Sequence, residues 1–351
     1  MNKKGILLFF NGKKYLFRLA AGCLSVLILL IFWLFLSPVV PGGKSIEHTI
    51  KIKHGSSFGQ IVDSLQSRGI VESRTKFTLV ARLSGLRKKI KAGKYAFRGG
   101  TSSYELLKIL AAGKVFSELV TIPEGKTAAQ IADILHTRVE IDSSEFMALV
   151  NDSSFCKKLR IPANSAEGFL YPETYRLSWG MSPTQIITAM VHQFYRQFND
   201  SLRSQIDKTG FTLLGTVTLA SIIEGEAVVD SERTLISAVY HNRLKRGMAL
   251  QADPTIQYII SDGPRRLRNR DLKIDSPYNT YLYPGLPPGP ICNPGLNSLK
   301  AALYPAKVKY LYFVAKGDGS HTFSKTYSEH LRAKAKFDRI RKRIARSKSK
   351  G

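Results

Sequence analysis

The sequence GSSFGQIVDSL at residues 55–65 decides the fold class, because its pattern returns as GTSSYELLKIL at 100–110 and as GKTAAQIADIL at 125–135. Each copy has a strand-like apolar run, a Gly-polar turn, and then apolar residues at helical spacing. The Ser or Thr that follows each glycine can cap the free amides of a first helical turn. Such strand-turn-helix units are too small to bury a core alone, so we group residues 46–155 as one α+β region that packs against itself.

An uncharged apolar run precedes these units, from Leu19 to Val40. Its length matches the roughly 20 residues that a helix needs to cross the hydrocarbon core of a bilayer, so we predict a transmembrane helix at 19–40. A cleaved signal peptide is the alternative, but the run is longer than a signal h-region and does not end in a small-x-small site. A Pro/Gly linker is expected at 38–44.

Charge sets the expected orientation. Basic side chains precede the apolar run: Lys3, Lys4, Lys13, Lys14 and Arg18. The positive-inside rule therefore keeps residues 1–18 in the cytoplasm and places the body outside it. An exported body does not meet genomic nucleic acid. The formal charge of +27, from 53 Lys and Arg against 26 Asp and Glu, then favours a membrane surface or an anionic envelope polymer as partner.

The pattern changes near residue 160, where longer helices and then a Pro/Gly/Tyr/Asn-rich section replace the short units. We place a domain boundary at 156–165 and assign residues 160–330 to a second, mixed α+β domain. One long helix is predicted at 213–244, with a break near Asp230 as the alternative, and a strand at 310–314.

The C-terminal segment, 331–351, is strongly basic. Between Arg332 and Lys350 it has ten Lys or Arg and one acid, Asp338. We expect a solvated helix or a disordered arm; contact with lipid headgroups or wall polymer is the alternative.

The cysteines do not indicate a metal site. Cys23 lies in the apolar run, which leaves only Cys156 and Cys292 free to form a disulfide, and the three share no metal-ligand spacing. The chain also has no Gly-rich phosphate loop, no HExxH and no Ser-His-Asp arrangement. We therefore expect no metal and no cofactor.

The stretch LASIIEGEAVVDSER at 219–233 places carboxylates in an otherwise apolar helix. A carboxyl group in a partly dry pocket has a raised pKa and can donate a proton near neutral pH, as a glycosidic oxygen requires of a general acid. Glu224 and Glu226 are two residues apart, about 200° around a helix, so they cannot flank one sugar bond together. Only one can be the acid. The alternative is that both are exposed or paired with Arg233 or Arg243.

Rigid loops downstream carry Tyr, Asn, Gln and Thr among prolines and glycines: LQADPT at 250–255, SPYNTY at 276–281 and GLPPGPICNPG at 285–295. Aromatic faces stack on pyranose rings, and amides hydrogen-bond sugar hydroxyl and N-acetyl groups, so these loops suit a sugar site. Ordinary turn chemistry explains the Pro and Gly alone. Asp253 with Pro254 also fits a plain turn or helix cap.

These separated motifs, in this order, resemble those of the MltG (YceG-like) family of endolytic murein transglycosylases. The resemblance covers about 165–325 and rests on segments 167–175, 220–226, 242–244, 250–255, 278–281, 285–295, 311–315 and 319–323. It implies an anchor in the bacterial inner (cytoplasmic) membrane, a LysM-like α+β region at 46–155, and a catalytic domain at 160–330.

The activity that the resemblance implies is cleavage between N-acetylmuramic acid and N-acetylglucosamine within glycan strands, with a role in cell-wall assembly and strand termination. The partners that it suggests are peptidoglycan strands, the membrane and peptidoglycan synthases, and nucleic acid is not expected. A non-catalytic peptidoglycan-binding or division scaffold is the alternative function.

In that family the second glutamate of the Ile-Ile-Glu-x-Glu motif is catalytic, which corresponds to Glu226 here. It would protonate the leaving oxygen and then, as a carboxylate, take the proton of the muramic acid C6 hydroxyl, which closes on C1 as a 1,6-anhydro end. No water is consumed, so no second carboxylate is required. A hydrolase would need one, Glu167 or Asp253. The hypothesised substrate contacts are Glu167, Gln251, Asp253, Tyr278 and Asn279.

Two positions beside Glu226 depart from the family pattern. Relatives often have Lys where this chain has Gly225, and Thr where it has Ala227. A glycine inside a helix costs about 1 kcal/mol relative to alanine, so we expect a local kink here.

Overall fold

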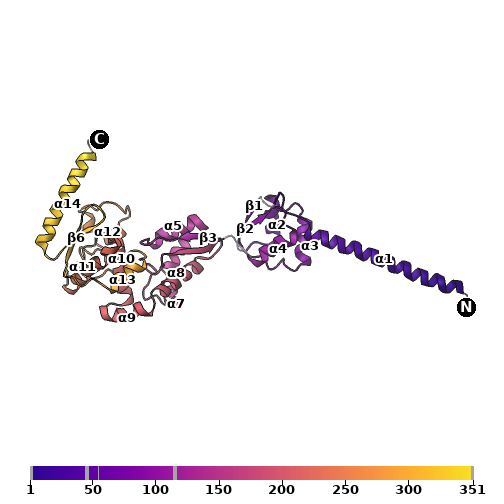
Figure 1. Ribbon diagram of the computed structural model, residues 1–351, viewed down its shortest axis with the longest axis horizontal. Coiled ribbons are helices and arrows are strands. Elements are labelled where there is room, and N and C mark those ends of the chain that lie inside the picture. Colours follow the sequence, from indigo (N-terminus) through magenta and orange to yellow (C-terminus); the bar gives the residue numbers. More distant parts are fainter. Residues whose placement is uncertain (1–2, 44–46, 54, 114–116, 349–351) are drawn as a thin grey trace. The chain divides into compact units, whose positions relative to one another are not determined.

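The computed structural model describes residues 3–43, 47–53, 55–113 and 117–348 (Figure 1). In these ranges helices predominate, and three two-stranded sheets pair β1 with β2, β3 with β4, and β5 with β6. The mixed α+β class predicted from the sequence is confirmed. Contacts divide the chain into two compact units, unit 1 (Met1–Glu118 with Ser178–Gly180) and unit 2 (Leu119–Leu177 with Met181–Gly351).

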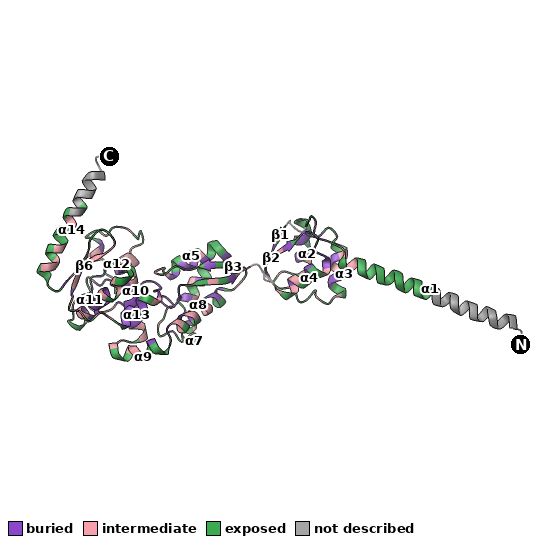
Figure 2. Ribbon diagram, viewed as in Figure 1, coloured by how far each residue is buried: buried purple, intermediate pink, exposed green. Residues whose placement is uncertain are grey.

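Helix α1 (Lys3–Leu36) contains the stretch Leu19–Leu36, which is long and apolar enough to cross a membrane. Most side chains of this stretch are exposed, including large ones such as Leu29 and Phe32 (Figure 2). Apolar surface without a protein partner is costly in water, whereas lipid tails accept it. The stretch therefore suits a single membrane anchor.

The helix ends before the predicted limit of residue 40. Val39 and Val40 are 4% and 2% exposed in the core of unit 1, and both backbone N–H groups donate to the Thr101 carbonyl oxygen. The predicted limit is wrong because apolarity alone does not separate a residue that faces lipid from one that faces protein. The first residues of the predicted linker, 38–40, likewise pair with 100–102.

The first two strand-turn-helix segments form unit 1. Its elements are β1 (Glu47–Ile52), α2 (Phe58–Ser67), α3 (Arg74–Leu83), β2 (Gly93–Arg98) and α4 (Ser103–Ala112). The strands are antiparallel, and the fully buried Ile50 and Tyr95 face each other in the register. Ser57 and Ser102 accept from the third N–H of their helices, as the sequence predicts.

The third strand-turn-helix segment also forms, but in unit 2. Thr127 caps α5 (Ala128–Val139), while β3 (Ser117–Thr121) pairs with β4 (Thr174–Ser178). Ile131 and Leu135 belong to the hydrophobic core of unit 2. Residues 46–155 therefore do not pack as one region, and contacts divide the chain at 118/119 instead of at 156–165. A repeated local pattern specifies a helix and its cap. It does not specify which distant strand pairs with the strand of the same unit.

The remaining elements of unit 2 are α6 (Ser143–Val150), α7 (Ser153–Lys158), α8 (Pro183–Gln197), α9 (Asp200–Thr209), α10 (Leu213–Glu226), α11 (Arg233–Lys245), α12 (Asp253–Ile259), α13 (Leu296–Leu303), β5 (Tyr312–Ala315), β6 (His321–Ser324) and α14 (Tyr327–Lys348). Helix α10 is central, since every residue from 216 to 223 is buried (Figure 2). It contacts α9, α11, α12 and α13. A helix that is apolar on all sides belongs in a core.

The long helix predicted at 213–244 is two helices. Helix α10 ends at Glu226, Ala227 is extended, and a 3₁₀ turn (Asp230–Glu232) precedes α11. The Asp230 carboxylate accepts from the Arg233 and Asn297 side chains, and these contacts hold the turn in place. The break lies close to the Asp230 position that the sequence offers as its alternative, and it leaves Glu226 at a helix end.

Three further expectations concern the basic C-terminal segment, the strand at 310–314 and the cysteines. The described part of the basic segment, 331–348, is helical as part of α14, which follows the antiparallel hairpin of β5 and β6. The strand predicted at 310–314 lies at 312–315. Cys156 and Cys292 are buried and free, so they do not form the disulfide that the sequence leaves open.

At Gly168 two other segments of unit 2 approach the backbone closely. Its φ is +86°, and an added Cβ would lie 2.4 Å from the Pro290 Cγ and 2.9 Å from the Val217 Cγ1. We expect Gly168→Ala to lower the free energy of unfolding by about 2–4 kcal/mol, measured by thermal unfolding of the detergent-solubilised full chain. Gly210→Ala is the control, because it shares a positive φ of +75° but has open space around it. Equal losses would contradict the packing argument.

Candidate active site

A cleft of about 800 Å³ opens in unit 2. It lies among the end of α10, helix α12 and the turn that leads into α5. The polar side chains on its wall include Thr127, Gln130, Glu167, Glu226, Asp253 and Gln257. A concave site with a few convergent polar groups is the usual form of a ligand-binding site.

Glu226 is the last residue of α10 and lines this cleft. The buried Tyr240 on α11 donates its O–H to Glu226 Oε1 at 2.9 Å. Burial raises the pKa of Glu226 to about 7, and the negative charge of Asp253 adds to this, whereas the Tyr240 hydrogen bond opposes it. A carboxyl group with this pKa is protonated for part of the time at neutral pH and can serve as a general acid.

Glu224 has different surroundings. Its Oε1 lies 3.2 Å from Arg233 Nη1, and its Oε2 accepts from the Gly295 N–H at 3.0 Å. Both carboxylate oxygens are thus used within the protein. Glu224 and Glu226 thus have different surroundings, as the rotation of about 200° between residues two apart in a helix predicts. Glu226 is the acid that faces the cleft.

Gly225, between the two acids, allows α12 to approach α10. A Cβ at this position would lie 2.6 Å from the Pro254 Cβ. Helix α10 remains helical through Gly225 and ends one residue later, and the glycine leaves room for close packing of Pro254. The close approach brings Asp253, the first residue of α12, into the same cleft as Glu226. Tyr281 donates its O–H to Asp253 Oδ1 at 2.5 Å.

Glu167 also reaches the cleft, but its carboxylate is held by the protein. Both of its oxygens accept from the Ala128 N–H, at 3.1 and 3.0 Å, and Oε1 accepts from Asn293 Nδ2 at 2.8 Å. Burial raises the pKa of Glu167 to about 7, against the effect of these hydrogen bonds. Glu167 therefore joins the first turn of α5 to the loop that contains Asn293.

Tyr278 lines a second cleft of about 620 Å³. Its ring packs against Tyr258, with centroids 5.1 Å apart. Glu167 and Tyr258 line both clefts, so the two adjoin along these side chains. Together the two clefts form a site that is longer than the cleft that Glu226 lines.

The other two sequence-predicted contacts lie elsewhere. Asn279 is fully buried, donates to the carbonyl oxygens of Leu272 and Ile274, and accepts from the Tyr281 N–H. Its amide thus holds a loop, and it lies outside the two described cleft walls. Gln251 also lies outside both linings; its Oε1 accepts from Arg243 at 3.3 Å.

Tyr240, Tyr281 and Arg243 are the residues of this site whose roles the sequence does not reveal. Tyr240 occupies an apolar helical position, where a tyrosine is ordinarily a core residue. Arg243 is 8% exposed and donates to backbone carbonyls of Leu250 and Leu311. The sequence marks Arg243 only as a possible partner of the two acids and as part of the family motif at 242–244, and neither reveals its contacts with the backbone.

Comparison with known proteins places the chain in a family. Residues 50–336 match the YceG-like family. The endolytic murein transglycosylase of Bacillus subtilis is 33% identical over 318 residues, which are 86% of this chain and 88% of that protein. The protein of the same name from Streptococcus pneumoniae strain D39 is 28% identical over 76% of this chain, which spans 54% of its length. A YceG-like protein of Listeria monocytogenes has a crystal structure with 32% identity and a TM-score of 0.58, covering 82% of this chain and 99% of that one. The chain therefore belongs to the YceG-like family.

Proposed function

We propose that this chain is an endolytic murein transglycosylase, which cleaves the bond between N-acetylmuramic acid and N-acetylglucosamine within glycan strands and leaves a 1,6-anhydro end. The observation that carries the proposal is Glu226, an acid with a raised pKa at the end of α10 in a large cleft. The names of the relatives in Bacillus subtilis and Streptococcus pneumoniae support the reaction class.

The proposed reaction uses one carboxyl group twice. Protonated Glu226 gives its proton to the glycosidic oxygen as the bond to C1 of muramic acid breaks. The carboxylate then takes the proton of the C6 hydroxyl, whose oxygen bonds to C1 and closes the anhydro ring. Glu226 ends protonated as it began, and no water enters. Tyr240 holds Oε1 in place throughout.

The substrate contacts follow from the linings of the two clefts. Asp253 and Glu167 lie on the wall that contains Glu226, and Tyr278 with Tyr258 offers aromatic surface in the adjoining cleft. Asn279 and Gln251 would affect the substrate only indirectly, through the hydrogen bonds that they make in their loops. Neither a metal nor an organic cofactor is part of the proposal.

The rest of the chain is proposed to keep this site at the wall. Helix α1 would anchor it in the bacterial inner membrane, with the N-terminus in the cytoplasm and the chain after Pro38 outside. In unit 1 the strand-helix-helix-strand order of β1, α2, α3 and β2 supports a LysM-like glycan-binding role. Peptidoglycan synthases remain the proposed protein partners.

Strand length tests the activity. Incubated with uncrosslinked glycan strands, the detergent-solubilised full chain should shorten the mean strand length well before small fragments accumulate, because endolytic cuts fall within the strand. A non-catalytic scaffold would leave the length distribution unchanged at every protein concentration. Release of small fragments from the first minutes, with long strands persisting, would indicate cleavage from strand ends and contradict the endolytic assignment.

Tyr240→Phe tests how Glu226 is tuned. The Tyr240 hydrogen bond lowers the pKa of Glu226, so its loss should raise that pKa further. A general acid works in its protonated form, and activity falls as pH rises through its pKa. The alkaline limb of the pH–rate profile should therefore move to higher pH. Tyr304→Phe, at an exposed tyrosine, is the control. If the alkaline limb of Tyr240→Phe stayed in place or moved to lower pH, the hydrogen bond from Tyr240 would not be what lowers the pKa of Glu226.

A further inference from the structure

An arginine-rich loop, residues 261–273, forms one wall of the active-site cleft. Ser261, Gly263 and Pro264 line the cleft directly. The next residue, Arg265, pairs through its backbone with the side chain of Gln257 on α12: its N–H donates to Gln257 Oε1 at 3.1 Å, and its carbonyl oxygen accepts from Gln257 Nε2. Gln257 also lines the cleft, so the loop is fixed to the helix that carries Asp253.

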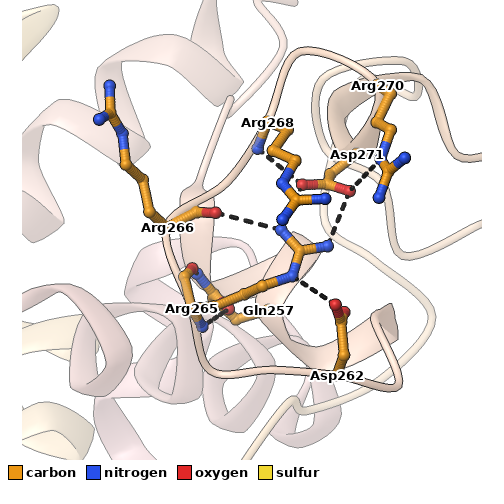
Figure 3. Close-up of polar contacts among 7 residues, drawn as sticks. All are labelled: Gln257, Asp262, Arg265, Arg266, Arg268, Arg270 and Asp271. Atoms are coloured by element: carbon orange, nitrogen blue, oxygen red, sulfur yellow. Dashed lines mark hydrogen bonds and ion pairs between the residues drawn. The ribbon is translucent and has the colours of Figure 1, made fainter.

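Asp271 anchors the loop from within (Figure 3). It is 4% exposed and accepts from Arg265 Nη1 and Nη2 at 2.7 and 3.0 Å, and from the Arg268 N–H at 2.6 Å. Arg265 Nε also donates to Asp262 at 2.7 Å. The Arg265 guanidinium holds the pKa of Asp271 well below its usual range. Both acids are thus engaged inside the loop.

The loop keeps an excess of exposed positive charge. Arg265 and Arg270, whose Nε is 3.9 Å from Asp271, balance Asp262 and Asp271. The exposed cations beyond this balance are Arg266, Arg268 and Lys273. Figure 3 shows the Arg266 side chain directed away from Asp271, although its carbonyl oxygen accepts from Arg265 Nη1 at 3.1 Å. The positive charges of Arg266, Arg268 and Lys273 are therefore not part of the described contacts that hold the loop.

Cleavage of a glycosidic bond does not explain these cations, since sugar rings are neutral and Glu226 supplies the proton. A murein strand nevertheless carries anions, because peptides attached to its muramic acid residues have free carboxylates. A guanidinium binds a carboxylate through two parallel N–H donors. A loop that is already fixed also loses little conformational entropy when it binds.

We propose that Arg266 and Arg268 bind carboxylates of the peptides on the strand that occupies the cleft, so that the loop selects peptide-bearing strands over bare glycan. This inference rests on the proposed function, since it takes the strand to lie beside Glu226. It assigns the two arginines a role in substrate selection and none in the chemistry.

Binding tests the inference separately from catalysis. The full-length Glu226→Gln chain, in uncharged detergent, is titrated with strands of matched length that either carry their peptides or have been stripped of them by an amidase. We expect peptide-bearing strands to bind roughly three- to tenfold more tightly, as two exposed charge pairs allow, and the preference to shrink as salt rises. Adding Arg266→Gln and Arg268→Gln should abolish the preference and leave binding of bare strands unchanged.

Arg196→Gln with Arg246→Gln is the matched control, because both arginines are exposed in unit 2 and lie outside the loop 261–273. Equal binding of the two strands by the unmodified loop would overturn the inference, as would an equal loss for both strands in the loop variant. So would a loop variant that keeps the peptide preference but no longer binds phosphatidylglycerol vesicles, which would assign the loop to the membrane surface. Failure of the proposed function would appear separately, as the absence of strand cleavage by the unsubstituted chain.

Discussion

Glu226→Gln should lower the rate of strand cleavage by about 10²–10⁴-fold, because an amide of the same shape cannot give a proton to the glycosidic oxygen. Strand binding should be retained, since Gln fills the same space and can still accept from the Tyr240 O–H. The measurement is initial cleavage rate on uncrosslinked strands beside equilibrium binding of the same strands. A variant with an unchanged rate would remove Glu226 from the chemistry.

Glu224→Gln is the matched control, with the same chemical change two residues earlier on α10. It breaks the partly buried pair with Arg233 and should lower the free energy of unfolding by about 3 kcal/mol. The cleavage rate per folded molecule should stay close to that of the unsubstituted chain, because Glu224 is directed to Arg233 and Gly295. A folded but inactive Glu224→Gln chain would show that the two acids act together.

Arg243→Met should lower the free energy of unfolding by about 3–5 kcal/mol, because buried carbonyl groups lose their donor. The Arg243 side chain donates to the carbonyl oxygens of Leu311 at 2.7 Å, Leu250 at 2.9 Å and Ala249 at 3.2 Å. It thus joins α11 to the segment before α12 and to the strand region of β5. Methionine keeps the apolar stem and replaces none of these hydrogen bonds.

The measurement is thermal unfolding of the full chain in detergent, followed by circular dichroism. Arg246→Met is the control, since it removes an exposed guanidinium three residues later and should change the free energy of unfolding by no more than about 0.5 kcal/mol. Similar midpoints for the two variants would mean that the Arg243 hydrogen bonds contribute little to stability.

The parts of the fold that the sequence predicts correctly are those with short-range causes. Ser57, Ser102 and Thr127 cap helices where expected, because a cap needs only a hydroxyl and the three residues that follow it. The apolar stretch of α1 is likewise predicted from composition alone, because a run of apolar residues as long as one membrane-spanning helix is enough to indicate it.

Distant partners explain the errors. The third strand-turn-helix segment resembles the first two in sequence, yet its strand pairs with 174–178, and no local pattern announces that choice. Helical periodicity continues from 213 to 244, but Asp230 makes side-chain contacts with Arg233 and Asn297 that hold a turn between two helices. Val39 and Val40 are as apolar as residues that face lipid, and they are buried in a protein core instead.

The candidate site divides in the same way. Two acids two residues apart on a helix must face different surroundings, and this holds for Glu224 and Glu226. Which of them lies in a cleft depends on Pro254 packing against Gly225, a contact between separate helices. The sequence predicts Asn279 at a sugar because amides suit sugars, but an amide serves equally well to hold backbone carbonyls, as the buried Asn279 does here.

The chemistry of the new chain ends tests the central claim most directly. Uncrosslinked strands are cleaved by the full chain in water labelled with heavy oxygen, and the products are read by mass spectrometry. A transglycosylase that uses Glu226 alone should give 1,6-anhydro-muramic ends without the label, because the C6 hydroxyl closes on C1. Reducing ends that carry the label would contradict this reaction and indicate hydrolysis, with Asp253 or Glu167 activating the water.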